Sequence, residues 1–120
     1  MATILTVDDS ASMRQMVTFT LKNAGHDVTE AVDGVDALEK ARQGSFQLVI
    51  TDVNMPNMDG ITLTRELRDL NDYKYTPILT LTTESDKNKK QEGKNAGATG
   101  WIIKPFNPEQ LLLTIKKVLG

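Results

Sequence analysis

Cysteine is absent from this chain of 120 residues. Its absence excludes disulfides, thiolate metal sites, iron–sulfur clusters and cysteine nucleophiles. Histidine occurs once, as His26, which excludes a metal centre with several histidine ligands. A catalytic triad that used His26 has no other support in the sequence.

Long hydrophobic runs are absent as well, because no run of apolar residues exceeds three. A transmembrane helix needs about 20 such residues, so the chain is not expected to span a membrane. The first residues, Met1–Leu5, lack the basic region of a signal peptide, and the acidic residues Asp8 and Asp9 follow soon after. These absences predict a cytoplasmic protein.

Net charge is small, at −2, but it is unevenly distributed along the chain. Residues 1–84 carry a net charge of −6, and residues 85–120 carry +4. The acidic first part argues against binding to a nucleic-acid backbone. The basic last part is either a docking face for an acidic partner or simply a solvated surface.

The overall composition, with 39% hydrophobic and 25% charged residues, is typical of a globular protein. A chain of this length buries roughly two-thirds of the surface that it exposes when unfolded, so it can fold unaided. No linker, internal repeat or low-complexity segment interrupts the pattern. The sequence therefore predicts one domain over residues 1–120.

Short β-forming segments alternate with helical patterns along the chain. The predicted strands are Thr3–Val7, Asp27–Ala31, Phe46–Thr51, Pro77–Thr82 and Trp101–Ile103. Ser10 would cap a first helix that buries Met13, Val17, Leu21 and Ala24, and Asp33 would cap a second that buries Val35, Leu38 and Ala41. A third helix has Leu63, Leu67 and Leu70 on one face, and a fourth runs from about Ser85 to Ala96. Pro108 would open a fifth helix, whose inward residues are Leu111, Leu112, Ile115, Val118 and Leu119. Such alternation implies a parallel sheet with helices on both faces, which is the α/β class.

Charged and hydroxyl side chains stand where the predicted strands end. They are Asp8 and Asp9 after the first strand, Asp52 after the third, Thr82 and Thr83 at the fourth and Lys104 after the fifth. Because the carboxyl ends of parallel strands meet at one edge of a sheet, these groups would surround one crevice. Three carboxylates about 4 Å apart repel one another. Mg²⁺ would remove this conflict, because it binds carboxylates and shares phosphate oxygens.

A lysine and a hydroxyl beside such a cation fit phosphoryl transfer, in which positioning and charge neutralisation supply most of the rate. One carboxylate would then be the nucleophile and form an aspartyl phosphate. Taken singly, each group has a simpler explanation. Asp8 or Asp9 could cap a helix, Asp52 could begin a turn, and threonines such as Thr82 are common in strands. Their occurrence at four strand ends favours a shared site.

Three segments, Val7–Ser10, Asp52–Gly60 and Lys104–Phe106, occur in this order and spacing. In these segments, and over its whole length, the chain resembles the receiver domains of bacterial two-component response regulators, in particular those of the stand-alone chemotaxis type. The resemblance implies a flavodoxin-like (βα)5 sandwich with a five-stranded parallel sheet in the strand order 2-1-3-4-5. It also implies a signalling switch that catalyses its own phosphorylation and dephosphorylation and is not a classical enzyme.

The resemblance implies a role for each group at the strand ends. Asp52 matches the aspartate that accepts the phosphoryl group. The implied Mg²⁺ ligands are Asp9, Asp52 and the backbone carbonyl of Asn54, and Asp8 contributes through a water or as an outer ligand. Lys104 matches the lysine that pairs with the phosphoryl group.

Two further positions are implied to form the switch. Thr82, rather than Thr83, matches the switch hydroxyl because it ends an apolar strand. Trp101 falls where the family usually has a tyrosine, an aromatic that turns inward as the threonine moves toward the phosphoryl group. The alternative is that Trp101 only covers the edge of the sheet. Pro105 matches a cis proline of the family.

Asn54 and Glu84 stand two residues beyond Asp52 and Thr82. In receiver domains these positions flank the path of the water that hydrolyses the aspartyl phosphate. The pairing of asparagine with glutamate is that of chemotaxis-type regulators with short-lived phosphorylation. We therefore expect fast self-dephosphorylation.

The implied partners are a sensor histidine kinase of the chemotaxis type and a flagellar motor switch protein. Because the chain ends after the last predicted helix, we expect output by docking to another protein. We also expect a monomer, with neither nucleic acid nor a membrane as partner. The expected docking face carries Lys87, Lys89, Lys90, Lys94, Trp101 and Phe106. Two alternatives within the family are a phosphorelay intermediate and a phosphate sink.

Two other classes are disfavoured by particular residues. A flavin-binding module would place a phosphate after the first strand, where Asp8 and Asp9 would repel it. A phosphatase of the aspartyl-phosphate type usually has a second aspartate two residues after the nucleophile, and that position is Asn54.

Overall fold

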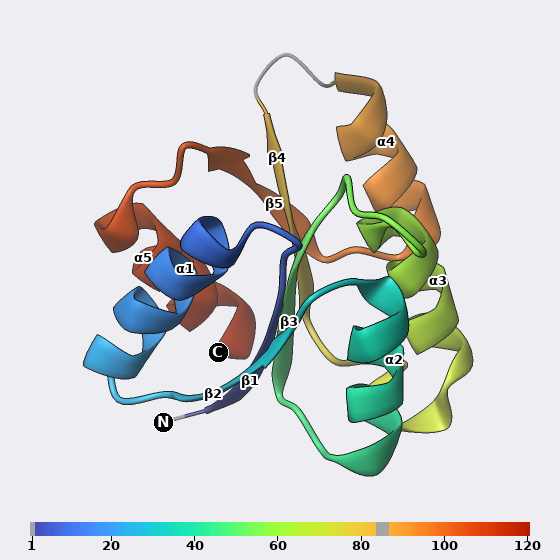
Figure 1. The fold of residues 1–120 in the computed structure, drawn as a ribbon, viewed down its shortest axis with the longest axis horizontal. Coiled ribbons are helices and arrows are strands. Elements are labelled where there is room, and N and C mark those ends of the chain that lie inside the picture. Colours follow the sequence, from blue (N-terminus) through green and yellow to red (C-terminus); the bar gives the residue numbers. More distant parts are fainter. Residues whose placement is uncertain (1, 84–86) are drawn as a thin grey trace.

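Five parallel strands form one sheet in the order β2-β1-β3-β4-β5 in the computed structural model, which describes residues 2–83 and 87–120 (Figure 1). The strands are β1 (Thr3–Val7), β2 (Asp27–Ala31), β3 (Leu48–Asp52), β4 (Ile78–Thr83) and β5 (Gly100–Lys104). The helices are α1 (Ala11–Asn23), α2 (Gly34–Gln43), α3 (Gly60–Asp69), α4 (Lys87–Ala96) and α5 (Pro108–Leu119), with a short 3-10 helix at Asn71–Tyr73. The predicted flavodoxin-like α/β fold and its strand order are confirmed.

Two layers of helices cover the sheet. Helices α1 and α5 lie on one face, and α2, α3 and α4 lie on the other (Figure 1). Neighbouring residues of a strand point to opposite faces, so Ile4 packs in the cluster with α1 and α5 whereas Leu5 packs in the cluster with α2 and α3. β3 is buried along its whole length because it is the central strand of a sheet covered on both faces.

Side-chain caps start the helices close to the strand ends. The hydroxyl of Ser10 accepts a hydrogen bond from the Met13 N–H at 3.3 Å, and the carboxylate of Asp33 accepts one from the Asp36 N–H at 2.8 Å. Both predicted caps are confirmed. Because Ser10 follows Asp9 directly, the first turn of α1 lies beside the acidic pair at the end of β1.

The strands extend further toward their carboxyl ends than the sequence predicted. β3 includes Asp52, β4 includes Thr83 and β5 includes Lys104. The sheet register pairs Asp52 with Leu81 and Thr83 with Lys104. Asp52 and Lys104 are therefore the last residues of paired strands and not the first residues of loops.

Some predictions about the helices differ from the structure. Val35 was predicted to face the core but is 50% exposed. An α-helix turns about 100° per residue, and the buried stripe of α2 consists of Gly34, Ala37, Leu38 and Ala41, to one side of Val35. Ala24 and Leu119 are also exposed, because they stand at the ends of α1 and α5.

The predicted start of the fourth helix near Ser85 lies outside the described residues, and α4 is described from Lys87. Among the helices of residues 2–83 and 87–120, none is long and apolar enough to cross a bilayer.

Gly60 begins α3 where this helix passes closest to β3. Its N–H donates to the Val53 carbonyl at 2.8 Å. A Cβ at this position would collide with the backbone carbonyl oxygen of Asp52. The close approach therefore requires glycine, and it presses the start of α3 against the backbone of a predicted site residue.

Gly60→Ala is expected to lower the free energy of unfolding by about 2 kcal/mol, because the new methyl group must displace the backbone of Asp52. The free energy would be measured by urea denaturation. Gly93→Ala is the matched control, since a Cβ at Gly93 in the middle of α4 would lie 3.8 Å from Thr80, an ordinary contact distance. This control should be neutral or stabilising by up to about 1 kcal/mol. Equal losses in the two variants would contradict the prediction.

Candidate functional site

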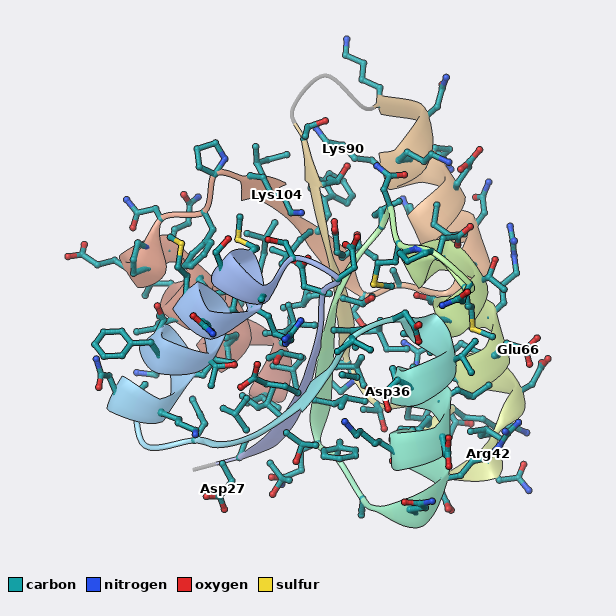
Figure 2. The ribbon with its side chains drawn as sticks, in the orientation of Figure 1. Asp27, Asp36, Arg42, Glu66, Lys90 and Lys104 are labelled. Atoms are coloured by element: carbon teal, nitrogen blue, oxygen red, sulfur yellow. The ribbon has the colours of Figure 1, made fainter. Side chains whose placement is uncertain are left out.

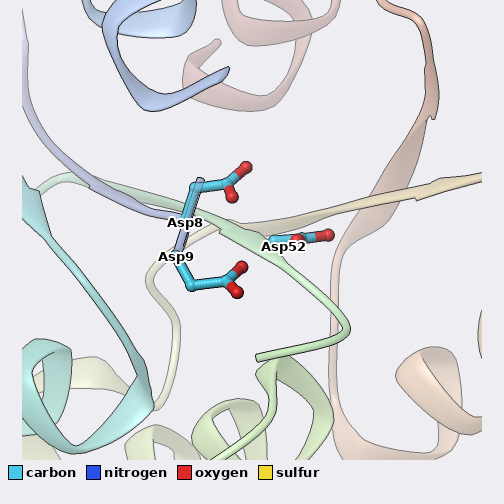
Figure 3. Close-up of side chains that lie close together, drawn as sticks. All are labelled: Asp8, Asp9 and Asp52. Carbon is cyan, nitrogen blue, oxygen red and sulfur yellow. The ribbon is translucent and has the colours of Figure 1, made fainter. Parts of the chain in front are cut away.

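The carboxylates predicted to share a site lie together at the carboxyl edge of the sheet. Asp8 and Asp9 follow β1, and Asp52 ends β3. One oxygen from each lies within 4.8 Å of the others. Figure 3 shows the three side chains directed to the same side of the two strand ends. The three carboxylates thus meet where the parallel arrangement of the strands predicted.

Lys104 joins this cluster from the end of β5 (Figure 2). Its ammonium donates to Oδ1 of Asp52 at 2.8 Å and lies 3.9 Å from Oδ2 of Asp8. The N–H of Val53 also donates to Oδ1 of Asp52, at 2.8 Å. Both hydrogen bonds therefore end on Oδ1, and the second oxygen of Asp52, Oδ2, takes part in neither.

Asp8 is the most deeply buried of the three carboxylates, with 2% of its surface exposed. Its Oδ1 accepts a hydrogen bond from the Ser10 N–H at 2.9 Å. Its Oδ2 is buried and has no hydrogen-bond partner among the residues that the structure describes. Burial raises the pKa of the Asp8 carboxyl above its ordinary 3.8, and the negative charges of Asp52 and Asp9 raise it further, against the opposing effects of the Ser10 N–H and Lys104.

These features fit a hard divalent cation. A buried carboxylate oxygen without a partner is costly, and so is the mutual repulsion of three carboxylates. The donor set consists of oxygens, which are the ligands that Mg²⁺ prefers. The carboxylates of Asp8, Asp9 and Asp52 therefore form a suitable Mg²⁺ site.

The other predicted site residues form no hydrogen bond or ion pair with this cluster among the residues that the structure describes. Asn54 is exposed in the loop after β3, and Thr82 is buried near the end of β4, where it pairs in register with Ile103. The peptide bond between Lys104 and Pro105 is cis, as the resemblance implied. Glu84 lies outside the described residues.

Trp101 lies on β5, and 45% of its surface is exposed. The ammonium of Lys90 on α4 lies 5.9 Å from the centroid of its ring. In this conformation Trp101 covers the outer edge of the sheet. Its inward rotation stays a prediction.

Arg14 was missed by the sequence analysis. Its Nη1 donates to the backbone carbonyl of Asp8 at 2.7 Å, and its Nε donates to the carboxylate of Glu30 at 2.8 Å. A signal was available, because Arg14 falls at helical spacing with Val17 and Leu21 on the buried side of α1. An arginine on such a face must find partners inside the fold.

Comparison with known proteins identifies the family. Residues 4–116 match the response regulator receiver domain. The chain is 40% identical over 119 residues to the chemotaxis protein CheY1 of Helicobacter pylori strain J99, covering 98% of this chain and 96% of that protein. The chain therefore belongs to the response regulator receiver domain family.

Solved structures agree with this assignment. The chemotaxis response regulator CheY4 of Vibrio cholerae superposes with a TM-score of 0.93 at 55% identity, covering 98% of each chain. The receiver domain of the sensor histidine kinase PA1611 from Pseudomonas aeruginosa PAO1, which has a magnesium ion coordinated in its active-site cleft, superposes with a TM-score of 0.93 at 26% identity. That match covers 99% of this chain and 98% of the other.

Asp8→Asn is expected to raise the melting temperature in EDTA by a few degrees, the change that about 1 kcal/mol produces in a domain of this size. The amide keeps the oxygen that accepts from Ser10 but removes a buried negative charge. The folded protein holds the Asp8 proton more tightly than the unfolded chain does. The parent therefore loses stability relative to the variant as the pH rises through the raised pKa.

The two melting temperatures should converge as the pH falls toward 3.8, the ordinary carboxyl value. Asp9→Asn is the matched control and should have a smaller effect, because Asp9 is exposed. Added Mg²⁺ should stabilise the parent more than either variant. A lower melting temperature for Asp8→Asn in EDTA would contradict this account of the buried charge.

Proposed function

We propose that this chain is a phosphorylation-activated switch of a two-component system, which accepts a phosphoryl group on Asp52 from a histidine kinase and signals by docking to another protein. The observation that carries the proposal is the Asp52–Lys104 pair at 2.8 Å, set against the carboxylates of Asp8 and Asp9. The named relatives, CheY1 and CheY4, are described as chemotaxis proteins, which supports a role in chemotaxis.

The chain's own residues account for the chemistry of the transfer. Asp8, Asp9, Asp52 and the backbone carbonyl of Asn54 would hold Mg²⁺, which when bound neutralises the carboxylates and the phosphoryl oxygens. Oδ2 of Asp52, which takes part in neither described hydrogen bond, is the oxygen that attacks phosphorus. As the new P–O bond forms, the P–N bond to the donor histidine breaks and the nitrogen keeps the electron pair. Lys104 neutralises charge on the transferred group.

The same site would return the switch to its resting state. Water attacks the phosphorus of the aspartyl phosphate, and the carboxylate of Asp52 leaves. In receiver domains the sequence positions of Asn54 and Glu84 flank the path of this water, and the pairing of asparagine with glutamate supports a short lifetime for the phosphorylated form. Fast loss of the phosphoryl group suits the control of motility.

In the proposed switch, the conformational change that follows phosphorylation passes along β4 and β5 to the face of α4 beside Trp101. Thr82 is the switch hydroxyl, and Trp101 is the aromatic that responds to it. Next to Trp101, a hollow of about 210 Å³ opens between α4 and β5, and both Lys90 and Lys94 line it. No ion pair joins either lysine to a carboxylate among the described residues. This basic hollow supports the proposal that an acidic segment of a flagellar motor switch protein docks there. The chain would act as a monomer in the cytoplasm.

Asp52→Asn is expected to abolish phosphorylation, because the amide cannot act as the nucleophile. The measurement is the intact mass of the protein after incubation with Mg²⁺ and acetyl phosphate. The parent should gain one labile phosphoryl group and lose it well within an hour after the donor is removed, whereas Asp52→Asn should gain none. Asp59→Asn is the matched control, because Asp59 caps α3 outside the cluster.

A parent that gains no adduct while folded would refute the proposed function, and a stable adduct on Asp52→Asn would refute the assignment of the acceptor. An adduct that persists for hours would contradict the fast self-dephosphorylation expected from Asn54 and Glu84.

Lys90→Gln combined with Lys94→Gln is expected to weaken binding of the phosphorylated chain to the purified motor switch protein by about tenfold, because both ammonium groups of the hollow are lost. The fluorescence of Trp101, the single tryptophan of the chain, would report binding. Lys116→Gln with Lys117→Gln removes the same charge from α5 and should change the affinity less than about threefold. Equal effects of the two double variants would contradict a specific role for the hollow. A parent that never binds the motor protein would favour a phosphorelay intermediate or a phosphate sink.

A further inference from the structure

Hydrogen bonds with neighbouring residues hold the backbone and side chain of Asp8 at the edge of the sheet. The N–H of Asp8 donates to the carbonyl of Ala31 on β2 at 3.2 Å. The carbonyl of Asp8 accepts from Nη1 of Arg14 at 2.7 Å. The side chain of Asp8 accepts from the Ser10 N–H at 2.9 Å. The carbonyl of Asp8 belongs to the peptide group that joins the two acidic residues, so Arg14 anchors the link between two proposed metal ligands.

Arg14 is itself held in place. Its side chain is only 16% exposed, and its Nε donates to the carboxylate of Glu30 on β2 at 2.8 Å. The backbone carbonyl of Glu30 accepts from the ammonium of Lys40 on α2 at 2.6 Å. A guanidinium is planar and its donors stand at fixed angles. Fixing Nε on Glu30 therefore also fixes the direction in which Nη1 meets the carbonyl of Asp8.

We propose that Arg14 is a positioning residue for the divalent cation. By anchoring the peptide group between Asp8 and Asp9, it directs both carboxylates toward Asp52, and Glu30 orients the guanidinium for this task. The inference rests on the proposed function of the acidic cluster as a metal site. Mg²⁺ demands near-ideal octahedral geometry, so a small rotation of this peptide weakens binding even though every ligand is still present.

Arg68 provides a matched control within the same chain. It is also half-buried, and its guanidinium donates to backbone carbonyls of Gly97 at 2.9 Å, Tyr73 at 2.6 Å and Thr76 at 2.7 Å. These carbonyls precede β4 and β5, so Arg68 acts at the amino edge of the sheet, opposite the acidic cluster. Replacing either arginine with methionine removes its hydrogen bonds but keeps an unbranched side chain.

The test measures Mg²⁺ affinity by titration calorimetry in the parent, Arg14→Met, Arg14→Lys and Arg68→Met, with melting temperatures recorded in EDTA. Arg14→Met is expected to weaken Mg²⁺ binding by about tenfold, the lower part of the range for groups that orient metal ligands. Arg14→Lys keeps one donor and should recover part of this loss. Arg68→Met should lower the melting temperature but change the Mg²⁺ affinity less than about twofold.

A second readout is hydrogen exchange at the Ser10 amide, which donates to Asp8. Without Mg²⁺, Arg14→Met should speed this exchange at least as much as that of amides at the far end of α1, whereas Arg68→Met should leave it unchanged. Unchanged Mg²⁺ affinity in Arg14→Met would overturn the inference, as would equal losses in Arg14→Met and Arg68→Met. If the folded parent binds no Mg²⁺, the proposed function fails. In that case, hydrogen exchange at the Ser10 amide tests separately whether Arg14 positions Asp8 and Asp9. Unchanged exchange in Arg14→Met would then overturn this positioning role.

Discussion

The mutual repulsion of three carboxylates at one edge of the sheet is the constraint on which the rest of this structure depends. Asp8, Asp9 and Asp52 are brought within 4.8 Å of one another, and Lys104 is the ammonium that meets them there. One positive charge cannot balance three negative ones, and the buried Oδ2 of Asp8 has no hydrogen-bond partner among the described residues. Such a site favours the binding of a divalent cation.

The fold sustains this crowding because the surrounding backbone leaves it little freedom. β3 is buried along its whole length and ends at Asp52, whose carbonyl lies against Gly60 at the start of α3. Arg14 anchors the acidic pair at the carboxyl edge of the sheet, and Arg68 joins the segments at its amino edge. Packing of β3 against α3 and the hydrogen bonds of the two arginines thus oppose the repulsion between the carboxylates and keep them close together.

Strand register links the site to the proposed docking face. Lys104 pairs with Thr83, and Trp101 pairs with Thr80, along the same two strands. Lys104 of the cluster and Trp101 beside the basic hollow therefore lie on the same pair of hydrogen-bonded strands. In the proposed switch, a change of charge at Asp52 alters α4 only to the extent that it favours one arrangement of β4, β5 and α4 over another. Lys90 lies over the ring of Trp101. A docking partner that contacts Lys90 would therefore sense a change in the arrangement of β4, β5 and α4.

The sequence alone determined the alternation of strands and helices, and hence a parallel α/β sheet. Because carboxyl ends of parallel strands share an edge, it also determined that Asp8, Asp9, Asp52 and Lys104 would meet. Residue spacing predicted the ends of strands and the buried face of a helix less well, as the extended end of β5 and the exposed Val35 show. The sequence positions of Asn54, Thr82 and Trp101 fit their implied roles, which stay predictions.

Only the tertiary structure decided which atoms of the site interact. It directed two hydrogen bonds to Oδ1 of Asp52 and brought Arg14 to the carbonyl of Asp8. It also buried one oxygen of Asp8 that has no hydrogen-bond partner within residues 2–83 and 87–120. The physical reason is that a local pattern specifies where a strand ends, whereas side-chain distances depend on how α1 and β2 pack beside β1 and on how β5 pairs with β4. Those contacts join residues far apart in the chain, and no local pattern contains them.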